Sequence, residues 1–260
     1  MNDSTDQSRD FWNNRAKTFP RFNDEPQSYE NSMLDLVRNH CLDFKGKTVL
    51  DVGCGTGLYT LKIAFEALKV TALDLSDQML EINRQDCLKL GLQNVKYVLS
   101  SFSDYQTPER FDIVFCSMCP AINNESSRIK LVDLTGEALI FIGFQHYVDP
   151  GILVKLFDYF KIERHILKNG PEMRYWLQNK GYRFASYLKS GQWYQERDLD
   201  DALNWCRMRL EAHGIKDPDE RALIDSIAPF FNPQSGLYNF DSPYEVEMLI
   251  WERNKNLGLT

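Results

Sequence analysis

A glycine-rich turn with a nearby acid is the part of the sequence best suited to chemistry. Residues 47–57 read KTVLDVGCGTG, in which Asp51 precedes three glycines at alternate positions, Gly53, Gly55 and Gly57. Glycine adopts positive φ and has no side chain, so the chain can turn sharply there and a ligand can contact the backbone. An apolar strand, such a turn and a helix N-terminus together predict a socket for a nucleotide-like molecule.

The spacing of these glycines differs from the dinucleotide pattern Gly-x-Gly-x-x-Gly, because Leu58 stands where that pattern has its last glycine. The Asp51 carboxylate would repel a pyrophosphate and attract a cation. Asp74 ends the next apolar stretch, about 20 residues beyond the glycines, where an acid can bind two ribose hydroxyls. The pattern therefore favours a positively charged nucleoside, and S-adenosylmethionine carries both an ammonium and a sulfonium group.

Two stretches resemble the class I S-adenosylmethionine-dependent methyltransferases. The first motif of that family, an acid followed by Gly-x-Gly-x-Gly, matches residues 51–57, and its second, an acid that closes strand two, matches Asp74 in ALDLSDQML. The resemblance covers residues 10–145 and implies S-adenosylmethionine as the cofactor. It also implies the cofactor-binding residues, which are Asp51, Gly53, Cys54 and Gly55 at the methionine portion, Asp74 at the ribose, and Leu75, Met79, Ser101 and Phe102 around the adenine.

The adenine side departs from the family pattern. Strand three of the family usually ends with an acid that binds the adenine amino group, whereas this chain has Ser100, Ser101 and Phe102 there. We expect the Ser101 hydroxyl and the Phe102 backbone to replace the acid.

Methyl transfer is expected at the ends of strands four and five. The sulfonium donor is already activated, so the protein mainly aligns the acceptor and excludes water, with a base where the acceptor is protonated. Residues 115–124 read FCSMCPAINN, which lacks the Asn/Asp-Pro-Pro-Tyr/Phe pattern of many amino-group methyltransferases and resembles a poorly described bacterial type. We expect Ser117 and Pro120 to border the transfer site and Ser117 also to contact the cofactor. The catalytic candidates are Ser117, Cys119 and His146.

Three cysteines allow an alternative reading of this site. Cys54 follows strand one, and Cys116 and Cys119 end strand four. If the three converge, they form a soft site for a metal or metalloid acceptor, or supply a nucleophilic thiolate; otherwise they fill space in the core. A single Cys-x-x-Cys is weak evidence for zinc, so we assign no metal. The order Cys119-Pro120 is also the reverse of the Pro-Cys order usual in cytosine-C5 enzymes.

The elements that position these residues alternate between strand and helix patterns. Strands are expected at residues 49–52, 69–73, 95–99, 111–116 and 138–144, with helices between most of them. This alternation predicts a Rossmann-like, doubly wound α/β sheet, mostly parallel, with helices on both faces. We expect the strand order 3-2-1-4-5, with the ligand beyond the carboxyl ends. The family resemblance implies that the apolar stretch 245–251 is an antiparallel last strand.

Two segments are expected to lie outside this core. Residues 1–30 include an aromatic-rich stretch, 8–22, which is interpreted either as a lid over the cofactor or as a surface helix packed on the body. Residues 31–260 are expected to form the methyltransferase domain, with a helical insertion around 194–243 that shapes the acceptor pocket.

Composition limits the partners. A net charge of −7 without a basic stripe argues against a nucleic-acid substrate and favours a small-molecule acceptor. The sequence contains no run of 18 apolar residues, so no membrane span is expected. The six cysteines are interpreted as the reduced thiols of a cytoplasmic protein. The oligomeric state does not follow from the sequence. Two further functions stay open, namely cofactor binding without turnover, and transfer of another group of the cofactor such as its aminocarboxypropyl arm.

Overall fold

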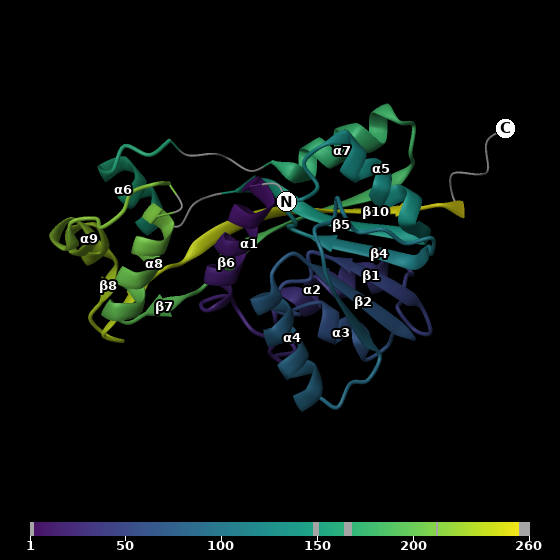
Figure 1. Ribbon diagram of the computed structural model, residues 1–260, viewed down its shortest axis with the longest axis horizontal. Helices are drawn as coiled ribbons and strands as arrows, with labels where there is room; N and C mark the ends of the chain where they lie inside the picture. The colour runs from purple at the N-terminus through teal and green to yellow at the C-terminus, as the bar shows by residue number, and fades with distance from the viewer. Residues whose placement is uncertain (1–2, 148–150, 164–167, 212, 255–260) are drawn as a thin grey trace. The chain divides into compact units, whose positions relative to one another are not determined.

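The computed structural model of the protein describes residues 3–147, 151–163, 168–211 and 213–254. Seven strands form one sheet in the order β3-β2-β1-β4-β5-β10-β6 (Figure 1). β1 pairs in parallel with β2 and β4, β2 with β3, and β4 with β5. The strands are β1 (Thr48–Val52), β2 (Lys69–Asp74), β3 (Val95–Leu99), β4 (Phe111–Ser117), β5 (Thr135–Tyr147), β6 (Phe184–Trp193) and β10 (Ser242–Glu252).

The last strand runs against its neighbours. The backbone N–H of Arg253, just after β10, donates to the carbonyl of Glu137 near the start of β5 at 2.8 Å, so the end of β10 lies beside the beginning of β5. On the other side, Ser186 early in β6 donates to Glu247 at the middle of β10 at 2.7 Å. The predicted order of the first five strands and the antiparallel last strand are confirmed.

The chain folds into two compact units, of which the first comprises Met1–Gly143, Asn169–Tyr187 and Glu247–Thr260. Side chains of β1 alternate between the two faces of the sheet. Leu50 and Val52 pack in one cluster with Leu131 and Met173, while Asp51 points to the opposite face and binds Thr60. The helices of this unit are α1 (Asp3–Ala16), α2 (Tyr29–Asn39), α3 (Thr60–Ala64), α4 (Asp77–Lys89), α5 (Glu125–Leu134) and α7 (Asn169–Asn179).

Helices therefore cover both faces. Figure 1 shows α5 and α7 on one side of the sheet and α3 and α4 on the other. The predicted fold class, a doubly wound and mostly parallel α/β sheet, is confirmed.

α4 begins where the sequence signals a cap. The Ser76 side chain accepts a hydrogen bond from the Met79 N–H, and Asp77 places an acid in the first turn, where it complements the helix dipole. The helix is followed by Gly91 at φ +69°. This arrangement fixes the segment that follows Asp74, at the carboxyl end of β2.

The second unit comprises Phe144–Lys168 and Leu188–Val246. Its helices are α6 (Gly151–Tyr159), α8 (Leu199–Glu211) and α9 (Glu220–Ile227), and η1 (Ala228–Phe230) is a 3₁₀ turn. A small sheet has the order β7-β9-β8, from β7 (Glu196–Arg197), β8 (Phe231–Asn232) and β9 (Leu237–Asn239). The unit has its own apolar core, which includes Leu156, Trp205, Leu223 and Phe240. α8 and α9 lie within the stretch 194–243 that was expected to be a helical insertion.

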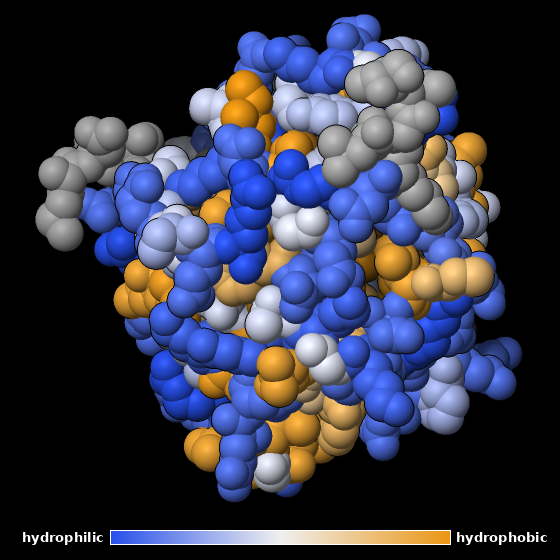
Figure 2. Space-filling model, turned by 90° about the vertical axis from the view of Figure 1, so that its right-hand side faces the viewer, coloured by the Kyte–Doolittle hydropathy of each residue, from blue (hydrophilic) through white to orange (hydrophobic). Residues whose placement is uncertain are grey.

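Within the described residues, no helix is long and apolar enough to cross a membrane. The face in Figure 2 has hydrophobic residues in separate groups bordered by hydrophilic ones. Exposed hydrophobic side chains of the first unit include Phe65, Leu68, Leu88 and Leu99.

Candidate functional site

The glycine turn lies at the carboxyl end of β1 and is held by β2. Gly53, Gly55 and Gly57 have φ values of +69°, +55° and +93°, a region that favours glycine. The N–H groups of Gly53 and Cys54 both donate to the carbonyl of Leu73, at 2.8 and 3.1 Å. The turn is thus pinned at the edge of the sheet where doubly wound folds bind ligands.

At Gly53 and Gly57 neighbouring side chains also leave no space for a Cβ atom. A Cβ at Gly53 would lie 2.6 Å from the Cys119 sulfur, and a Cβ at Gly57 would lie 2.5 Å from the Asn83 amide carbon. No side chain fits at position 57 because the Asn83 amide occupies that space. At Gly55, by contrast, nothing lies closer than a Phe19 ring carbon at 4.0 Å, which leaves room beside the backbone.

Asp74 holds both the glycine turn and the start of α4. Its Oδ2 accepts a hydrogen bond from the Gly55 N–H and its Oδ1 from the Ser76 N–H, each at 2.9 Å. Burial raises the pKa of Asp74, and the backbone hydrogen bonds from Ser76, Gly55 and Leu75 oppose this rise. The carboxylate is thus fixed in place with lone pairs left for a ligand.

Asp51 is more deeply buried than Asp74, with 3% of its surface exposed. The Thr60 hydroxyl donates to its Oδ2 at 2.6 Å. Burial raises the pKa of Asp51 to about 7, the Thr60 hydrogen bond opposes the rise, and the charge of Asp74 adds to it. A cation placed near these two acids would stabilise the charged form of both.

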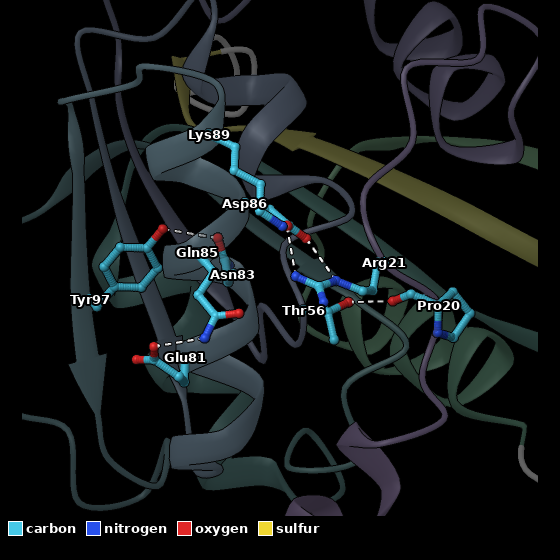
Figure 3. Close-up of polar contacts among 9 residues, drawn as sticks. All are labelled: Pro20, Arg21, Thr56, Glu81, Asn83, Gln85, Asp86, Lys89 and Tyr97. Carbon is cyan, nitrogen blue, oxygen red and sulfur yellow. Dashed lines mark hydrogen bonds and ion pairs between the residues drawn. The ribbon is translucent and has the colours of Figure 1, made fainter.

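The segment after α1 crosses the glycine turn. The Thr56 hydroxyl donates to the carbonyl of Pro20 at 2.6 Å, and Arg21 donates to both carboxylate oxygens of Asp86 on α4 at 2.7 and 3.1 Å (Figure 3). The Phe19 ring lies next to Gly55.

α1 itself contacts the start of α4. Asn13 donates to the Asp77 carboxylate at 2.8 Å, and its side-chain oxygen accepts from Ser76. Residues 13–21 therefore border the socket formed by the turn and Asp74.

The loop after β3 contains an acid that the residue pattern did not single out. Ser101 donates to the Asp104 carboxylate at 2.7 Å, and the Asp104 N–H donates back to the Ser101 oxygen at 3.1 Å. The carbonyl of Phe102 accepts from Lys130 at 2.6 Å, and the Phe102 side chain is buried. The sequence does contain a signal for this contact, because a serine three residues before an acid, here Ser101 and Asp104, is typical of a turn closed by side-chain hydrogen bonds.

The two other residues expected near the adenine differ in exposure. Leu75 is half-buried, and its carbonyl accepts a hydrogen bond from Arg9 at 3.4 Å. The Met79 side chain is 1% exposed, so it has little surface free for a ligand. The Met79 backbone N–H donates to the Ser76 side chain that caps α4.

A second group not expected from the sequence lies at the end of β4. The Tyr59 side chain is buried, its ring lies 4.8 Å from the Phe115 ring, and its hydroxyl lies beside Ser117 and Tyr29. Burial raises the pKa of Tyr59, so this phenol stays protonated. The sequence gives little indication that Tyr59 belongs to the site, because a tyrosine two residues after Gly57 is equally typical of the core.

The other transfer-site candidates are placed unevenly. Ser117 is half-buried at the end of β4, Met118 adopts φ +51°, and Pro120 is exposed. His146 lies within β5, but its side chain falls outside the described residues.

The three cysteines do not share one cluster. Cys54 packs with Ala72 and Leu80, whereas Cys116 and Cys119 lie in the core cluster on the other side of the turn. Burial raises the pKa of the Cys54 and Cys116 thiols well above the ordinary value, so both stay protonated. Over the described parts of the chain, no group of three or more His, Cys, Asp or Glu side chains could hold a metal ion.

Comparison with known families identifies the segment that carries this geometry. Residues 49–134, from β1 to α5, match the family described as "Methyltransferase domain". This match agrees with the resemblance based on Asp51, the three glycines and Asp74. The more specific bacterial type suggested by residues 117–121 is not addressed by the match.

Curated relatives align with about a third of the chain or less. "Ubiquinone biosynthesis O-methyltransferase" of Vibrio atlanticus is 40% identical over 73 residues, which is 27% of this chain and 30% of that protein. "(S)-coclaurine N-methyltransferase" of Papaver somniferum is 36% identical over 88 residues, which is 33% of this chain and 25% of that protein. The chain thus aligns with less than half the length of these relatives.

Solved structures extend the likeness to almost the whole chain. The magnesium protoporphyrin IX methyltransferase of Synechocystis PCC 6803 with bound SAH has a TM-score of 0.54 at 15% identity, covering 95% of this chain and 99% of that one. At this identity the likeness shows a shared fold.

Proposed function

We propose that this protein is an S-adenosylmethionine-dependent methyltransferase that acts on a small molecule. The observation that carries the proposal is the acid-flanked glycine turn, in which Asp74 fixes the backbone of Gly55 at 2.9 Å while the side-chain space of Gly55 stays open. A turn that presents free backbone between two acids suits a cationic nucleoside better than a phosphate chain. The family match over residues 49–134 supports the same cofactor.

The residues of the turn fit the methionine and ribose portions. Asp51 provides negative charge for the ammonium group, and Gly53 and Gly55 allow close approach to the backbone. Asp74 keeps acceptor capacity for the ribose hydroxyls, since its two oxygens can accept about four hydrogen bonds and the backbone N–H groups of Gly55, Ser76 and Leu75 use up to three. When bound, S-adenosylmethionine supplies a methyl group on a positively charged sulfur.

The adenine is assigned to the loop after β3. Ser101 and Asp104 supply polar atoms there, and Leu75 and Phe102 supply apolar surface. In this assignment Asp104 takes the role that an acid at the end of strand three has in the family.

The acceptor is assigned to the ends of β4 and β5. Ser117, Tyr59 and Pro120 would border it, and His146 is the candidate base where the acceptor is protonated. The stretch Ser-Met-Cys-Pro-Ala at residues 117–121 supports the poorly described bacterial type. An in-line displacement needs alignment of the acceptor and removal of water more than strong acid–base chemistry.

The N-terminal segment would adapt the site. Residues 1–30 would act as a lid, which is supported by the contacts of Pro20 with Thr56 and of Arg21 with Asp86. A net charge of −7 and six free cysteines support a cytoplasmic protein without a nucleic-acid partner.

Calorimetric titration with S-adenosylhomocysteine, NAD and ATP tests the cofactor assignment. We expect binding of S-adenosylhomocysteine alone. Binding of NAD or ATP with no response to S-adenosylhomocysteine would overturn the proposal.

Incubation with S-adenosylmethionine and a metabolite extract then separates the remaining functions. Methyl transfer releases S-adenosylhomocysteine, whereas aminocarboxypropyl transfer releases methylthioadenosine. Tight binding with neither product would indicate a cofactor-binding protein without turnover.

A further inference from the structure

A line of hydrogen bonds runs from the surface of β3 to the buried acid of β1. The Tyr97 hydroxyl donates to the Asn83 side-chain oxygen at 3.0 Å (Figure 3). The Asn83 amide nitrogen donates to the Thr60 oxygen at 3.3 Å, and the Thr60 hydroxyl donates to Asp51 at 2.6 Å. Four residues from β3, α4, α3 and β1 are thus connected in one line.

In each of these three hydrogen bonds the donor lies on the Tyr97 side and the acceptor on the Asp51 side. A hydroxyl has a single hydrogen, so Tyr97 and Thr60 each donate once. Because the Tyr97 hydrogen occupies the Asn83 oxygen, the amide is oriented with its nitrogen towards Thr60. The Thr60 oxygen is then an acceptor for Asn83, and its own hydrogen is free for Asp51. Aligned hydrogen bonds of this kind polarise one another and favour a negative charge at the accepting end.

The line is sealed from water along most of its length. Asp51 is 3% exposed, and Thr60 and Asn83 are fully buried. Gly57 also lies against the Asn83 amide so closely that a Cβ at Gly57 would be 2.5 Å from the amide carbon, which leaves no room for a water molecule between these two residues. Only Tyr97 at the far end is partly accessible.

The remaining groups around the line bear on the charge of Asp51. Asp74 from β2 opposes the ionisation of Asp51 by its negative charge, and the buried Cys54 and Cys116 thiols face it from the turn and from β4. At the other end, the Arg84 guanidinium lies 4.9 Å from the centre of the Tyr97 ring, and Cys87 lies beside the Tyr97 hydroxyl. Burial and Asp74 thus act against a charged Asp51, and the hydrogen-bonded line acts for it.

We propose that Tyr97, Asn83 and Thr60 are positioning residues that hold the Asp51 carboxylate oriented and charged for the cationic end of the cofactor. This inference rests on the proposed function for the identity of the ligand. With a pKa of about 7, Asp51 is partly protonated in the free protein near neutral pH, and it must be charged in the complex. Binding of the cofactor therefore releases a proton, and the affinity rises as the pH increases through about 7.

The variant Tyr97→Phe tests the line, because it removes only the first hydroxyl and leaves the ring. The affinity for S-adenosylhomocysteine is measured by calorimetry from pH 6 to 8.5, in two buffers with different heats of protonation. At pH 6.5 we expect binding to be about three- to tenfold weaker than in the wild type, the effect of one hydrogen bond. At pH 8.5, where Asp51 is charged in both proteins, we expect equal affinities.

Tyr159→Phe is the matched control, because Tyr159 is exposed on α6, and it should follow the wild type at every pH. Thr60→Val removes the hydroxyl that touches Asp51 and should shift the pH dependence further in the same direction. An equal loss at all pH values in Tyr97→Phe, or no loss at any, would overturn the inference.

A measurement without ligand separates this inference from the proposed function. Carbon-13 NMR of labelled aspartate follows the titration of Asp51 in the free protein. We expect Tyr97→Phe to raise the pKa of Asp51, and an unchanged titration would reject the line as a positioning device. Failure of the wild type to bind S-adenosylhomocysteine would reject the proposed function, and with it the ligand named here, while the NMR result would still report on the line.

Discussion

The Asp74 carboxylate accepts a hydrogen bond from the backbone N–H of Gly55 at 2.9 Å. The acid at the end of β2 therefore fixes the turn that follows β1. Two motifs that lie about 20 residues apart in the sequence become one structural unit, a relation expected at the carboxyl edge of a parallel sheet. A ligand that contacts Asp74 is thereby placed next to the free backbone of the turn.

Asp74→Asn should weaken cofactor binding strongly. The amide keeps the shape of the side chain but loses the charge and one acceptor, so we expect a loss of about 1.5–3 kcal/mol in the binding of S-adenosylhomocysteine, as for charge-assisted hydrogen bonds. One of the N–H groups of Gly55 and Ser76 loses its acceptor in Asp74→Asn and both lose it in Asp74→Ala, so the melting temperature should fall in both variants and further in the second. Calorimetry measures the affinity, with Asp133→Asn on the exposed face of α5 as the control. An unchanged affinity in Asp74→Asn would place the ribose elsewhere.

Gly55→Ala should separate ligand binding from stability. Gly55 and Gly91 both have positive φ, and a Cβ would meet no close atom at either position. We therefore expect similar losses of stability in Gly55→Ala and Gly91→Ala, about 1 kcal/mol for a left-handed alanine. Only Gly55→Ala should lose binding of S-adenosylhomocysteine, because its methyl group occupies the space beside the turn. Thermal unfolding and calorimetry on both variants check this, and equal binding by the two would argue against a ligand at Gly55.

Asp51→Asn should stabilise the protein at alkaline pH while it weakens the cofactor site. The pKa of Asp51 is raised to about 7, so between its unfolded value near 3.8 and 7 the folded state binds more protons than the unfolded state. Stability is then lost as the pH rises through this window, by up to about 4 kcal/mol at 1.36 kcal/mol per pKa unit. The uncharged asparagine avoids this cost and still accepts from Thr60.

Melting temperatures at pH 5 and pH 8.5 measure this effect. We expect the variant to melt moderately higher than the wild type at pH 5 and higher by a larger margin at pH 8.5. Binding of S-adenosylhomocysteine should fall most at pH 8.5, where Asp51 of the wild type is charged. A lower melting temperature of the variant than of the wild type at pH 8.5 would mean that the charged form of Asp51 does not destabilise the free protein.

Local patterns were sufficient to predict the sheet. The alternation of apolar strands and helices indicated the order of the first five strands, and the Ser76 cap indicated the start of α4. The extents were less accurate, since β5 spans Thr135–Tyr147 where a strand over 138–144 was expected.

Pairwise contacts were not predictable in the same way. Asn83 looked like any polar residue of an amphipathic helix, yet it lies against Gly57 and connects Tyr97 to Thr60. Whether Cys54 lies near Cys116 and Cys119 was left open because all three stand at strand ends, and its side chain packs with Ala72 and Leu80 on the α4 side of the turn. Such relations depend on the register and direction of side chains, which residue spacing alone leaves open.

Loss of the Arg21–Asp86 ion pair should speed release of the cofactor. Burial opposes the charge of Asp86, but hydrogen bonds from Arg21 and Lys89 lower its pKa below the ordinary value. If residues 13–21 form a lid, Arg21→Gln and Asp86→Asn should each increase the dissociation rate of S-adenosylhomocysteine by a few-fold, as expected for a part-exposed pair of about 1 kcal/mol. The double variant should add little, since both changes break the same contact.

Stopped-flow displacement of a bound fluorescent analogue measures these rates. Arg38→Gln is a suitable control, because Arg38 pairs with Asp35 and Glu66 at the surface and has no place in the proposed site. Dissociation rates equal to the wild type in both single variants would favour the alternative interpretation of the N-terminal segment, a helix packed on the body without a gating role.

The cysteines should differ sharply in their reactivity with iodoacetamide. Cys41 is exposed, whereas Cys54, Cys116 and Cys119 are buried, and burial raises the pKa of the Cys54 and Cys116 thiols so that little thiolate forms at neutral pH. We expect rapid alkylation of Cys41 in the native protein and slow alkylation of the other three until it is unfolded, as followed by mass spectrometry of peptides. Cys41→Ser should abolish the fast phase, and a chelator should change neither phase. Fast native alkylation of Cys119, or a chelator-sensitive rate at Cys54, would instead support the thiol-rich acceptor site, because only an accessible thiolate reacts quickly with the reagent.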